Sequence, residues 1–275
     1  MGEAGANCLQ GGKMKTNSFF AAAVLLAASV CSVANAAEPL IIGADSSNPP
    51  WEYKDTDGNY IGFEIDLCNE IGRRLNMDVK VEDYGFPALF PGVSSGRIQA
   101  AISSLTITKE RLKGASFTQG YYDSDLALVS RTGSGIEKLS QVSGKTIGAV
   151  SASVGEKWVK DNTQKYSIGD YRGYNTQDPL LLDAKAGRID AAIGDISGIQ
   201  FAIKKIKGLT VYEKIPTGDQ FAIMLPKNSP LLPKINDVIT QLKKDGYMAE
   251  LHKKWFGVAP DANSSTVQER PIPTP

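Results

Sequence analysis

The sequence contains the segment Gly96-Arg97-Ile98-Gln99-Ala100-Ala101-Ile102, which recurs as Gly187-Arg188-Ile189-Asp190-Ala191-Ala192-Ile193 with one difference in seven positions. Each copy follows an apolar stretch with helical spacing. Glycine ends helices well because it adopts the left-handed conformation without a Cβ clash. The isoleucines and alanines that follow suit a buried parallel strand. Each copy therefore predicts a helix, a glycine stop and a strand.

A second, shorter repeat supports the same plan. Ile42-Gly43-Ala44 and Ile147-Gly148-Ala149 both end strand-like segments, and both open into polar loops. Apolar residues at helical spacing also predict helices over 63–75 and 235–242. Together the repeats predict an α/β protein whose two lobes follow one plan.

The composition of the 275-residue chain excludes several classes of function. Thirty Lys and Arg residues balance thirty Asp and Glu residues, so the chain lacks the basic field that holds proteins on nucleic acid. Three Cys and one His are too few for a structural zinc site of four such ligands with any to spare. We therefore expect no nucleic-acid partner, no metal site and no cofactor.

Both ends of the chain carry segments that we expect to lie outside the fold. Lys13 and Lys15 precede an apolar run over 19–33 that ends in Ala34-Asn35-Ala36. A positive segment, a short apolar segment and small residues predict a secretory signal peptide, here cleaved after Ala36, with translation starting at Met14. Residues 259–275 are rich in Pro, Ser and Thr and have no apolar stripe, which predicts a disordered tail.

Polar loops follow the predicted strands, where open α/β sheets bind their ligands. Ser153 stands three residues before Glu156, a capping-box spacing that predicts a helix N-terminus able to bind a small anion. Arg111 can hold a carboxylate with two parallel hydrogen bonds if it reaches the same cavity. Asp195 follows an apolar strand and is suited to a cation. Taken alone, Ser153 is better explained as a plain helix cap, whereas for Asp195 the spacing favours helix capping and cation binding equally.

An arginine with helix-terminus donors and an aspartate match the carboxylate and the ammonium of a free amino acid. Trp51 and Phe86 could then enclose the ligand side chain, and Asp45 could contact a positive or amide end. The alternative is that both aromatic residues belong to the core.

Several segments resemble the periplasmic polar amino acid binding proteins of ABC importers, the bacterial extracellular solute-binding family 3. The resemblance covers almost all of residues 39–258 and rests on these segments: Gly43-Ala44-Asp45 through Pro49-Pro50-Trp51, Gly62-Phe63-Glu64-Ile65-Asp66-Leu67, Ser103-Ser104-Leu105-Thr106-Ile107-Thr108 with Arg111, Phe117-Thr118, Gly187-Arg188-Ile189-Asp190, and Lys254-Trp255-Phe256-Gly257.

The resemblance implies a two-lobed type II periplasmic binding protein fold, in which each lobe is a sheet flanked by helices and two crossing hinge strands join the lobes. Lobe 1 would comprise 37–124 and 222–258, and lobe 2 would comprise 125–221. It also implies a monomer in the periplasm that closes on a basic or amide L-amino acid and delivers it to the membrane permease subunits of an ABC importer.

The family pattern also implies roles for single residues. Arg111, Ser153 and the Val154 N–H would bind the ligand carboxylate, and Asp195 with the Ser104 carbonyl and the Thr106 hydroxyl would bind the ammonium. The side-chain pocket would be lined by Asp45, Asn48, Trp51 and Phe86. Three positions depart from the pattern, because many relatives have Asp at Pro87, Asp at Gln99 and Thr at Val154.

Two other functions compete with this interpretation. Some proteins of this fold act as dehydratases on prephenate- or arogenate-like acids, which requires a positioned proton donor or acceptor. Asp45 or Asp195 could serve, although neither has an evident His, Lys or metal partner. The third possibility is a ligand-sensing partner of a membrane receptor. We expect no catalytic residues, since the only His lies on a terminal helix.

Overall fold

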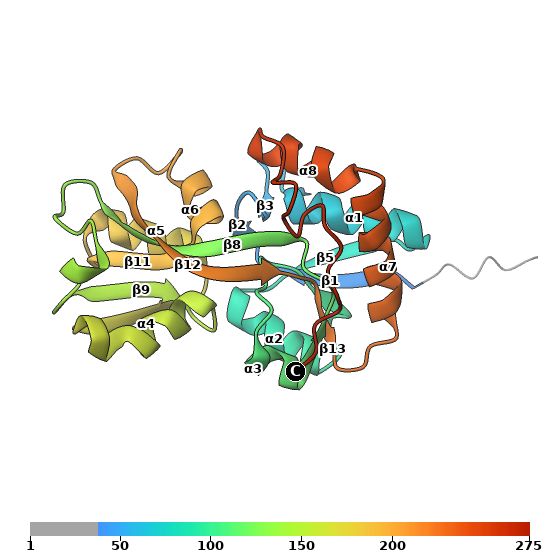
Figure 1. The fold of residues 1–275 in the computed structure, drawn as a ribbon, viewed down its shortest axis with the longest axis horizontal. Coiled ribbons are helices and arrows are strands. Elements are labelled where there is room, and N and C mark those ends of the chain that lie inside the picture. Colours follow the sequence, from blue (N-terminus) through green and yellow to red (C-terminus); the bar gives the residue numbers. More distant parts are fainter. Residues whose placement is uncertain (1–37) are drawn as a thin grey trace, which may run out of the picture. The chain divides into compact units, whose positions relative to one another are not determined.

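The computed structural model describes residues 38–275 (Figure 1). The predicted signal peptide and its cleavage site lie outside the described residues. Within the described part of the chain, no helix is both long and apolar enough to cross a membrane.

The first lobe is built on a five-stranded sheet with the order β5-β1-β6-β13-β7. β1 pairs in parallel with β5 and β6, whereas β13 is antiparallel to β6 and β7. The strands are β1 (Leu40–Ala44), β5 (Val79–Asp83), β6 (Ala100–Ala101), β7 (Ala115–Phe117) and β13 (Met224–Pro226). The helices of this lobe are α1 (Phe63–Leu75), α2 (Phe86–Ser94), α3 (Lys109–Gly114), α7 (Leu231–Lys244) and α8 (Tyr247–Phe256). A small three-stranded sheet contains β2 (Ser47–Asn48), β3 (Glu52–Lys54) and β4 (Tyr60–Ile61).

The second lobe is built on a five-stranded sheet with the order β10-β9-β11-β8-β12. β9 pairs in parallel with β10 and β11, whereas β8 is antiparallel to β11 and β12. The strands are β8 (Tyr122–Arg131), β9 (Thr146–Val150), β10 (Asp170–Tyr174), β11 (Ala191–Asp195) and β12 (Leu209–Phe221). The helices are α4 (Val154–Tyr166), α5 (Gln177–Ala186), α6 (Ile196–Ala202) and the short 3-10 helix η1 (Leu139–Gln141). In Figure 1, β8 and β12 run side by side between the two lobes, which confirms the two-lobed α/β fold class.

The two copies of the repeat build equivalent corners of the two sheets. Gly96 and Gly187 both adopt positive φ, at 72° and 73°, where the chain leaves α2 and α5. A Cβ on Gly43 would lie 2.4 Å from Cδ1 of Ile98, and a Cβ on Gly148 would lie 2.6 Å from Cδ1 of Ile189. Each repeat isoleucine therefore packs directly on the glycine of its neighbouring strand.

The one difference between the copies preserves a hydrogen bond. The Oε1 atom of Gln99 accepts the backbone N–H of Ile41 at 2.9 Å, and Oδ2 of Asp190 accepts that of Thr146 at 2.8 Å. An amide oxygen and a carboxylate oxygen both accept this donor. The departure at Gln99 thus leaves the lobe 1 scaffold intact.

The C-terminal tail is packed against lobe 1, which corrects the prediction of disorder over 259–275. Ser265 and Thr266 are fully buried, and the Ser265 N–H donates to Oδ2 of Asp123 at 2.8 Å. Buried Lys243 donates to the carbonyl of Gln268 at 3.0 Å. The tail is held by polar contacts to buried groups, which a search for an apolar stripe does not detect.

Candidate functional site

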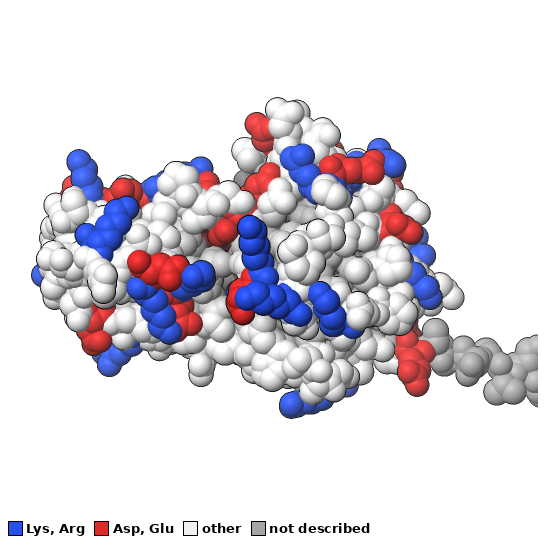
Figure 2. All heavy atoms as spheres, turned by 60° about the horizontal axis from the view of Figure 1, so that its bottom comes forward, with Lys and Arg blue, Asp and Glu red and all other residues white. Residues whose placement is uncertain are grey.

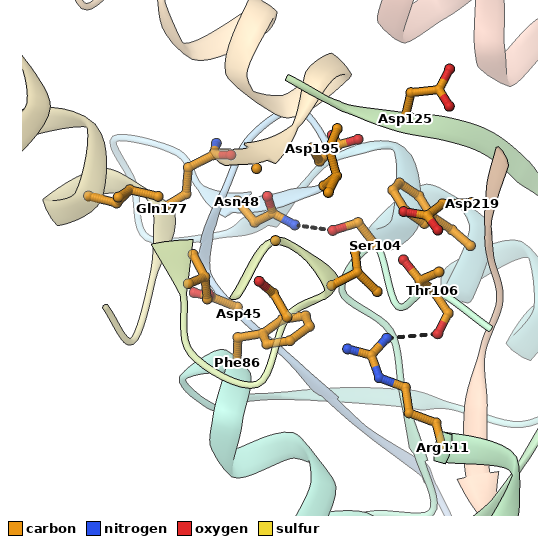
Figure 3. A pocket seen from close by; sticks show the side chains of 18 residues that line it. Asp45, Asn48, Phe86, Ser104, Thr106, Arg111, Asp125, Gln177, Asp195 and Asp219 are labelled. Atoms are coloured by element: carbon orange, nitrogen blue, oxygen red, sulfur yellow. Dashed lines mark hydrogen bonds between the residues drawn. The ribbon is translucent and has the colours of Figure 1, made fainter. Parts of the chain in front are cut away.

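A cavity of about 70 Å³ lies where the strand ends of both lobes meet (Figure 3). All of the predicted site residues except Trp51 line it, namely Asp45, Asn48, Phe86, Ser104, Thr106, Arg111, Ser153, Val154 and Asp195. Residues that sequence reasoning did not select also line it, and they are Asp125, Leu126, Val150, Gly155, Gln177, Leu180, Gly194, Asp219 and Phe221. The cavity has room for several waters or one small solute.

Arg111 supplies the positive charge of the cavity from lobe 1. It lies in α3, whose N-cap Thr108 accepts the Arg111 backbone N–H at 3.1 Å. Its guanidinium donates to the Thr106 carbonyl at 2.7 Å and, across the lobes, to the Ala152 carbonyl at 2.9 Å. Burial lowers the pKa of Arg111 to about 10, so the group stays cationic at neutral pH.

Two aromatic rings hold the guanidinium in place. The Arg111 Cζ atom lies 5.7 Å from the centre of the Phe86 ring and 4.9 Å from that of Phe90. Cation–π contacts of this kind orient a guanidinium without consuming its N–H donors. Phe86 thus both lines the cavity and packs against its cation.

The start of α4 forms the facing wall in lobe 2. Ser153 is the N-cap, and its hydroxyl accepts the Glu156 N–H at 3.1 Å. Oε2 of Glu156 in turn accepts the Ala152 N–H at 2.6 Å. A Cβ on Gly155 would lie 2.9 Å from the Ile193 carbonyl, so the helix approaches β11 closely. This geometry sets the positive end of the α4 dipole against the cavity.

Asp195 combines capping with exposure to the cavity. Its Oδ1 accepts the Gly198 N–H at 2.6 Å and the Trp51 indole N–H at 3.3 Å, while the Ser124 hydroxyl donates to Oδ2. Burial raises the pKa of Asp195 above its ordinary value, although these donors oppose the rise. Asp195 therefore caps α6 and also lines the cavity.

Trp51 is not part of the cavity wall, which corrects its predicted place beside the ligand side chain. The residue is fully buried, and its ring packs edge-on against Tyr122 at 4.5 Å and Phe221 at 5.3 Å between centroids. The indole N–H reaches Asp195 from behind. A tryptophan after two prolines has the same sequence pattern whether it lines a pocket or supports one.

Asp45, Asn48 and Ser104 form the lobe 1 side of the cavity away from Arg111. Burial raises the pKa of Asp45 to about 7, although a bond from the Ser47 N–H, at 3.0 Å, opposes the rise. The Asn48 amide donates to the Ser104 hydroxyl at 3.0 Å. Figure 3 shows the Asn48 and Ser104 side chains on the same side of the cavity as Asp195.

Three polar residues of the wall escaped the sequence analysis. Gln177 is the first residue of α5 and lies three residues beyond the end of β10, so inspecting the loop after that strand as well would have found it. Asp125 and Asp219 come from β8 and β12, the strands that connect the lobes. β12 changes register between Ile215 and Asp219, and no sequence pattern indicated which side chains this turns inward.

The charges of the lining favour a cation. Asp45, Asp195 and Asp219 line a cavity whose lining contains one cationic residue, Arg111, whereas the Asp125 carboxylate is paired with Lys214, with Oδ2 2.6 Å from Nζ. Low-dielectric walls concentrate such a field and raise the affinity for the opposite charge. By contrast, Lys, Arg, Asp and Glu side chains are interspersed on the outer face shown in Figure 2.

Comparisons with known proteins identify a family and several relatives that this chain resembles. Residues 40–258 match the model of the bacterial extracellular solute-binding proteins, family 3. The lysine/arginine/ornithine-binding periplasmic protein of Escherichia coli (strain K12) is 30% identical over 241 residues, which cover 84% of this chain and 92% of that protein. The arginine-binding extracellular protein ArtP of Bacillus subtilis (strain 168) is 29% identical over 249 residues, which cover 86% of this chain and 95% of that protein. A solved structure of an ancestral arginine-binding protein bound to arginine matches with a TM-score of 0.76 and 29% identity, covering 81% of this chain and 100% of that one.

Proposed function

The chain belongs to the bacterial extracellular solute-binding proteins of family 3, and we propose that it captures a free cationic L-amino acid, arginine before others, for an ABC importer. The observation that carries this proposal is the placement of Arg111 and Asp195 in one cavity, on opposite lobes. Arg111 binds the α-carboxylate, assisted by Ser153 and the first turn of α4. Asp195 binds the α-ammonium together with Ser104 and Thr106.

The excess of carboxylates supports a basic ligand over an acidic one. Arg111 and Asp195 are assigned to the α-carboxylate and the α-ammonium of the ligand. Asp45, which lines the cavity with Phe86 and Gln177, then remains to contact the ligand side chain. A guanidinium or ammonium side chain compensates Asp45, whereas a second carboxylate on the ligand would repel it. Relatives that bind arginine or lysine by name support the same choice.

Ligand binding closes the lobes in this mechanism. Two hydrogen bonds already join the lobes, from Arg111 to the Ala152 carbonyl and from the Trp51 indole to Asp195. Each joins side chains or backbone of one lobe to the other. A ligand that touches both walls adds to these contacts and shifts the population toward the closed state. The permease subunits would then bind the closed form.

We infer a binding role rather than catalysis. The described lining of the cavity contains no His, Lys or Cys side chain to transfer a proton beside its aspartates. His252 lies elsewhere, stacked on Tyr122 with its Nδ1 2.9 Å from the Val258 carbonyl. Incubation with prephenate and arogenate tests this point, since release of a dehydrated product would establish an enzyme. The names of periplasmic and extracellular relatives support a location outside the cytoplasmic membrane, and we expect a monomer there.

Thermal unfolding with a panel of free amino acids tests the proposed function. A ligand at about a thousand times its dissociation constant stabilises the fold by roughly 4 kcal/mol. We expect arginine and lysine to raise the melting temperature, glutamine to raise it less, and glutamate to leave it unchanged. Mass spectrometry of ligand released from the purified protein identifies any retained cargo. An unchanged melting temperature across the panel, with no released amino acid, would contradict the proposal.

A further inference from the structure

Two buried glutamates lie directly behind the cavity. Glu52 begins β3 and Glu64 is the second residue of α1, and both are fully buried. In the described part of the chain, neither forms an ion pair with Lys, Arg or His. The titratable groups that face them are Tyr121, Cys68 and Asp195, none of which is a cation. Burying two carboxylates without a cation is costly.

Three of the four carboxyl oxygens of this pair accept hydrogen bonds. Oε1 of Glu52 accepts from the Ser103 hydroxyl at 2.5 Å and from the Asn48 amide at 3.0 Å. The Ser104 N–H is shared between Oε1 and Oε2 of Glu64, at 2.9 and 3.1 Å, and the Tyr121 hydroxyl also donates to Oε1. Oε2 of Glu52 is buried and has no hydrogen-bond partner among the described residues.

A proton on Oε2 of Glu52 gives this buried atom a hydrogen-bond partner, because it can then donate to Glu64. The two carboxyl groups are close enough to hydrogen-bond to each other, which two ionised groups cannot do. Burial, then the charge of Glu64, raises the pKa of Glu52 well above its ordinary value, and burial also raises that of Glu64. Like charges in contact favour one shared proton, as in other carboxylate pairs.

We propose that Glu52 and Glu64 share one proton and that this pair positions Asn48 and Ser104 in the ligand-binding wall. Glu52 orients the Asn48 amide, which also donates to Ser104. Glu64 holds the Ser104 backbone, whose φ of 42° lies in the left-handed region that costs free energy for a serine. The hydrogen bonds to the pair offset that cost.

The shared proton links the fold to pH in one direction. A carboxyl group whose pKa is higher in the folded state than in the unfolded state stabilises the fold less as pH rises. The free energy of unfolding therefore decreases as pH rises above the ordinary pKa of glutamate, because the unfolded chain releases a proton that the folded pair retains. In Glu52→Gln the amide donates to Glu64 and still accepts from Asn48 and Ser103, so the pair needs no proton. This variant should lose less stability than the wild type as pH rises.

Infrared spectroscopy and thermal unfolding test the pair without any ligand. We expect the wild type at neutral pH to show the carbonyl band of a buried protonated carboxyl group, and Glu52→Gln to lack that component. We also expect the melting temperature of Glu52→Gln, relative to the wild type, to rise steadily from pH 5 to pH 9. Glu137→Gln, at an exposed site, is the matched control and should change neither readout. An unchanged infrared band in Glu52→Gln, or parallel melting curves over this pH range, would overturn the shared proton.

The positioning role is tested by rescue, and this part alone rests on the proposed function. Glu52→Ala leaves the donors of Asn48 and Ser103 without their acceptor, so we expect arginine affinity to fall by about tenfold or more. Glu52→Gln should restore most of that loss. Equal affinities in both variants would overturn the positioning role, whereas binding of no amino acid by any form, with the infrared result intact, would instead contradict the proposed function.

Discussion

The two copies of the internal repeat build the same scaffold but present different chemistry to the cavity. In each copy an isoleucine packs on a strand glycine, and a side-chain oxygen accepts a backbone N–H of the neighbouring strand. Two residues beyond the strands' shared Ala-Ala-Ile, Ser104 in lobe 1 occupies the position of Asp195 in lobe 2. After the glycine strands, Asp45 of lobe 1 occupies the position of Val150. All four residues line the cavity.

The difference teaches that the scaffold and the binding chemistry are separable. Each lobe contributes one aspartate and one uncharged residue. Lobe 1 has its aspartate at the end of the glycine strand, whereas lobe 2 has its aspartate at the end of the repeat strand. The strand interiors are buried and constrained by packing, whereas the residues at the carboxyl ends of the strands are free to vary with the ligand. Substitutions at the strand ends should therefore change affinity, and substitutions within the repeat should change stability.

The largest effect is expected at Asp195. In Asp195→Asn the amide oxygen still caps α6 through the Gly198 N–H, but the charge that faces the ligand ammonium is lost. Removing one partner of a buried charge pair costs about 3–5 kcal/mol, which weakens binding by at least about 100-fold. Isothermal titration with arginine measures this. A loss below about tenfold, in a variant that melts like the wild type, would place the ammonium elsewhere.

The next effect concerns Asp45 and pH. Because its pKa in the free protein is about 7, Asp45 must release a proton to bind a cationic side chain at acid pH. We expect affinity for arginine to fall below pH 7, approaching about tenfold per pH unit. Asp45→Asn should bind arginine more weakly at pH 8 and lose this component of the pH dependence. Glutamine, which has no cationic side chain, is the control ligand. The same pH profile in Asp45→Asn would exclude Asp45 as the responsible group.

A smaller effect is expected at Ser104, the lobe 1 counterpart of Asp195. Ser104→Ala removes a hydroxyl that accepts from Asn48 but keeps the backbone carbonyl assigned to the ammonium. A neutral hydrogen bond contributes about 1 kcal/mol, so affinity should fall by roughly fivefold. If Ser104→Ala weakened arginine binding as much as Asp195→Asn, the proposed division between a charged and an uncharged strand end would be wrong.

The smallest effect is expected inside the repeat. Ile98→Val and Ile189→Val each remove one methyl group that packs on a strand glycine. Each should reduce the free energy of unfolding by about 0.5–1.5 kcal/mol and leave arginine affinity unchanged. Denaturant unfolding measures both variants side by side. Costs that differ by more than about 2 kcal/mol would show that the two corners are not equivalent in packing.

Sequence periodicity and glycine placement predicted the scaffold because packing leaves few alternatives there. Strands buried on both faces must be apolar, and Gly43 and Gly148 are required where an isoleucine lies against the backbone. The loops after the strands were found by the general position of ligands in open α/β sheets. Gln99 departs from the family pattern, but its side-chain oxygen accepts a backbone N–H of the neighbouring strand as that of Asp190 does.

The remaining features depend on geometry that a linear pattern does not carry. Trp51 supports the cavity from behind because its indole points to Asp195, and only the three-dimensional arrangement distinguishes support from lining. Asp219 enters the wall through a register change in β12. Glu52 and Glu64 look like ordinary charged residues in the sequence, and their burial follows from how β3 and α1 pack together.

The most direct test of the proposed function is a calorimetric comparison of L-arginine with agmatine, which is arginine without its α-carboxylate. We predict that the wild type prefers arginine by at least about 100-fold, because the carboxylate forms charge-assisted bonds with Arg111. In Arg111→Met, which keeps an unbranched side chain to pack on Phe86 and Phe90, the preference should shrink below about tenfold. A wild type that binds both ligands equally, or a preference that survives intact in Arg111→Met, would contradict the account.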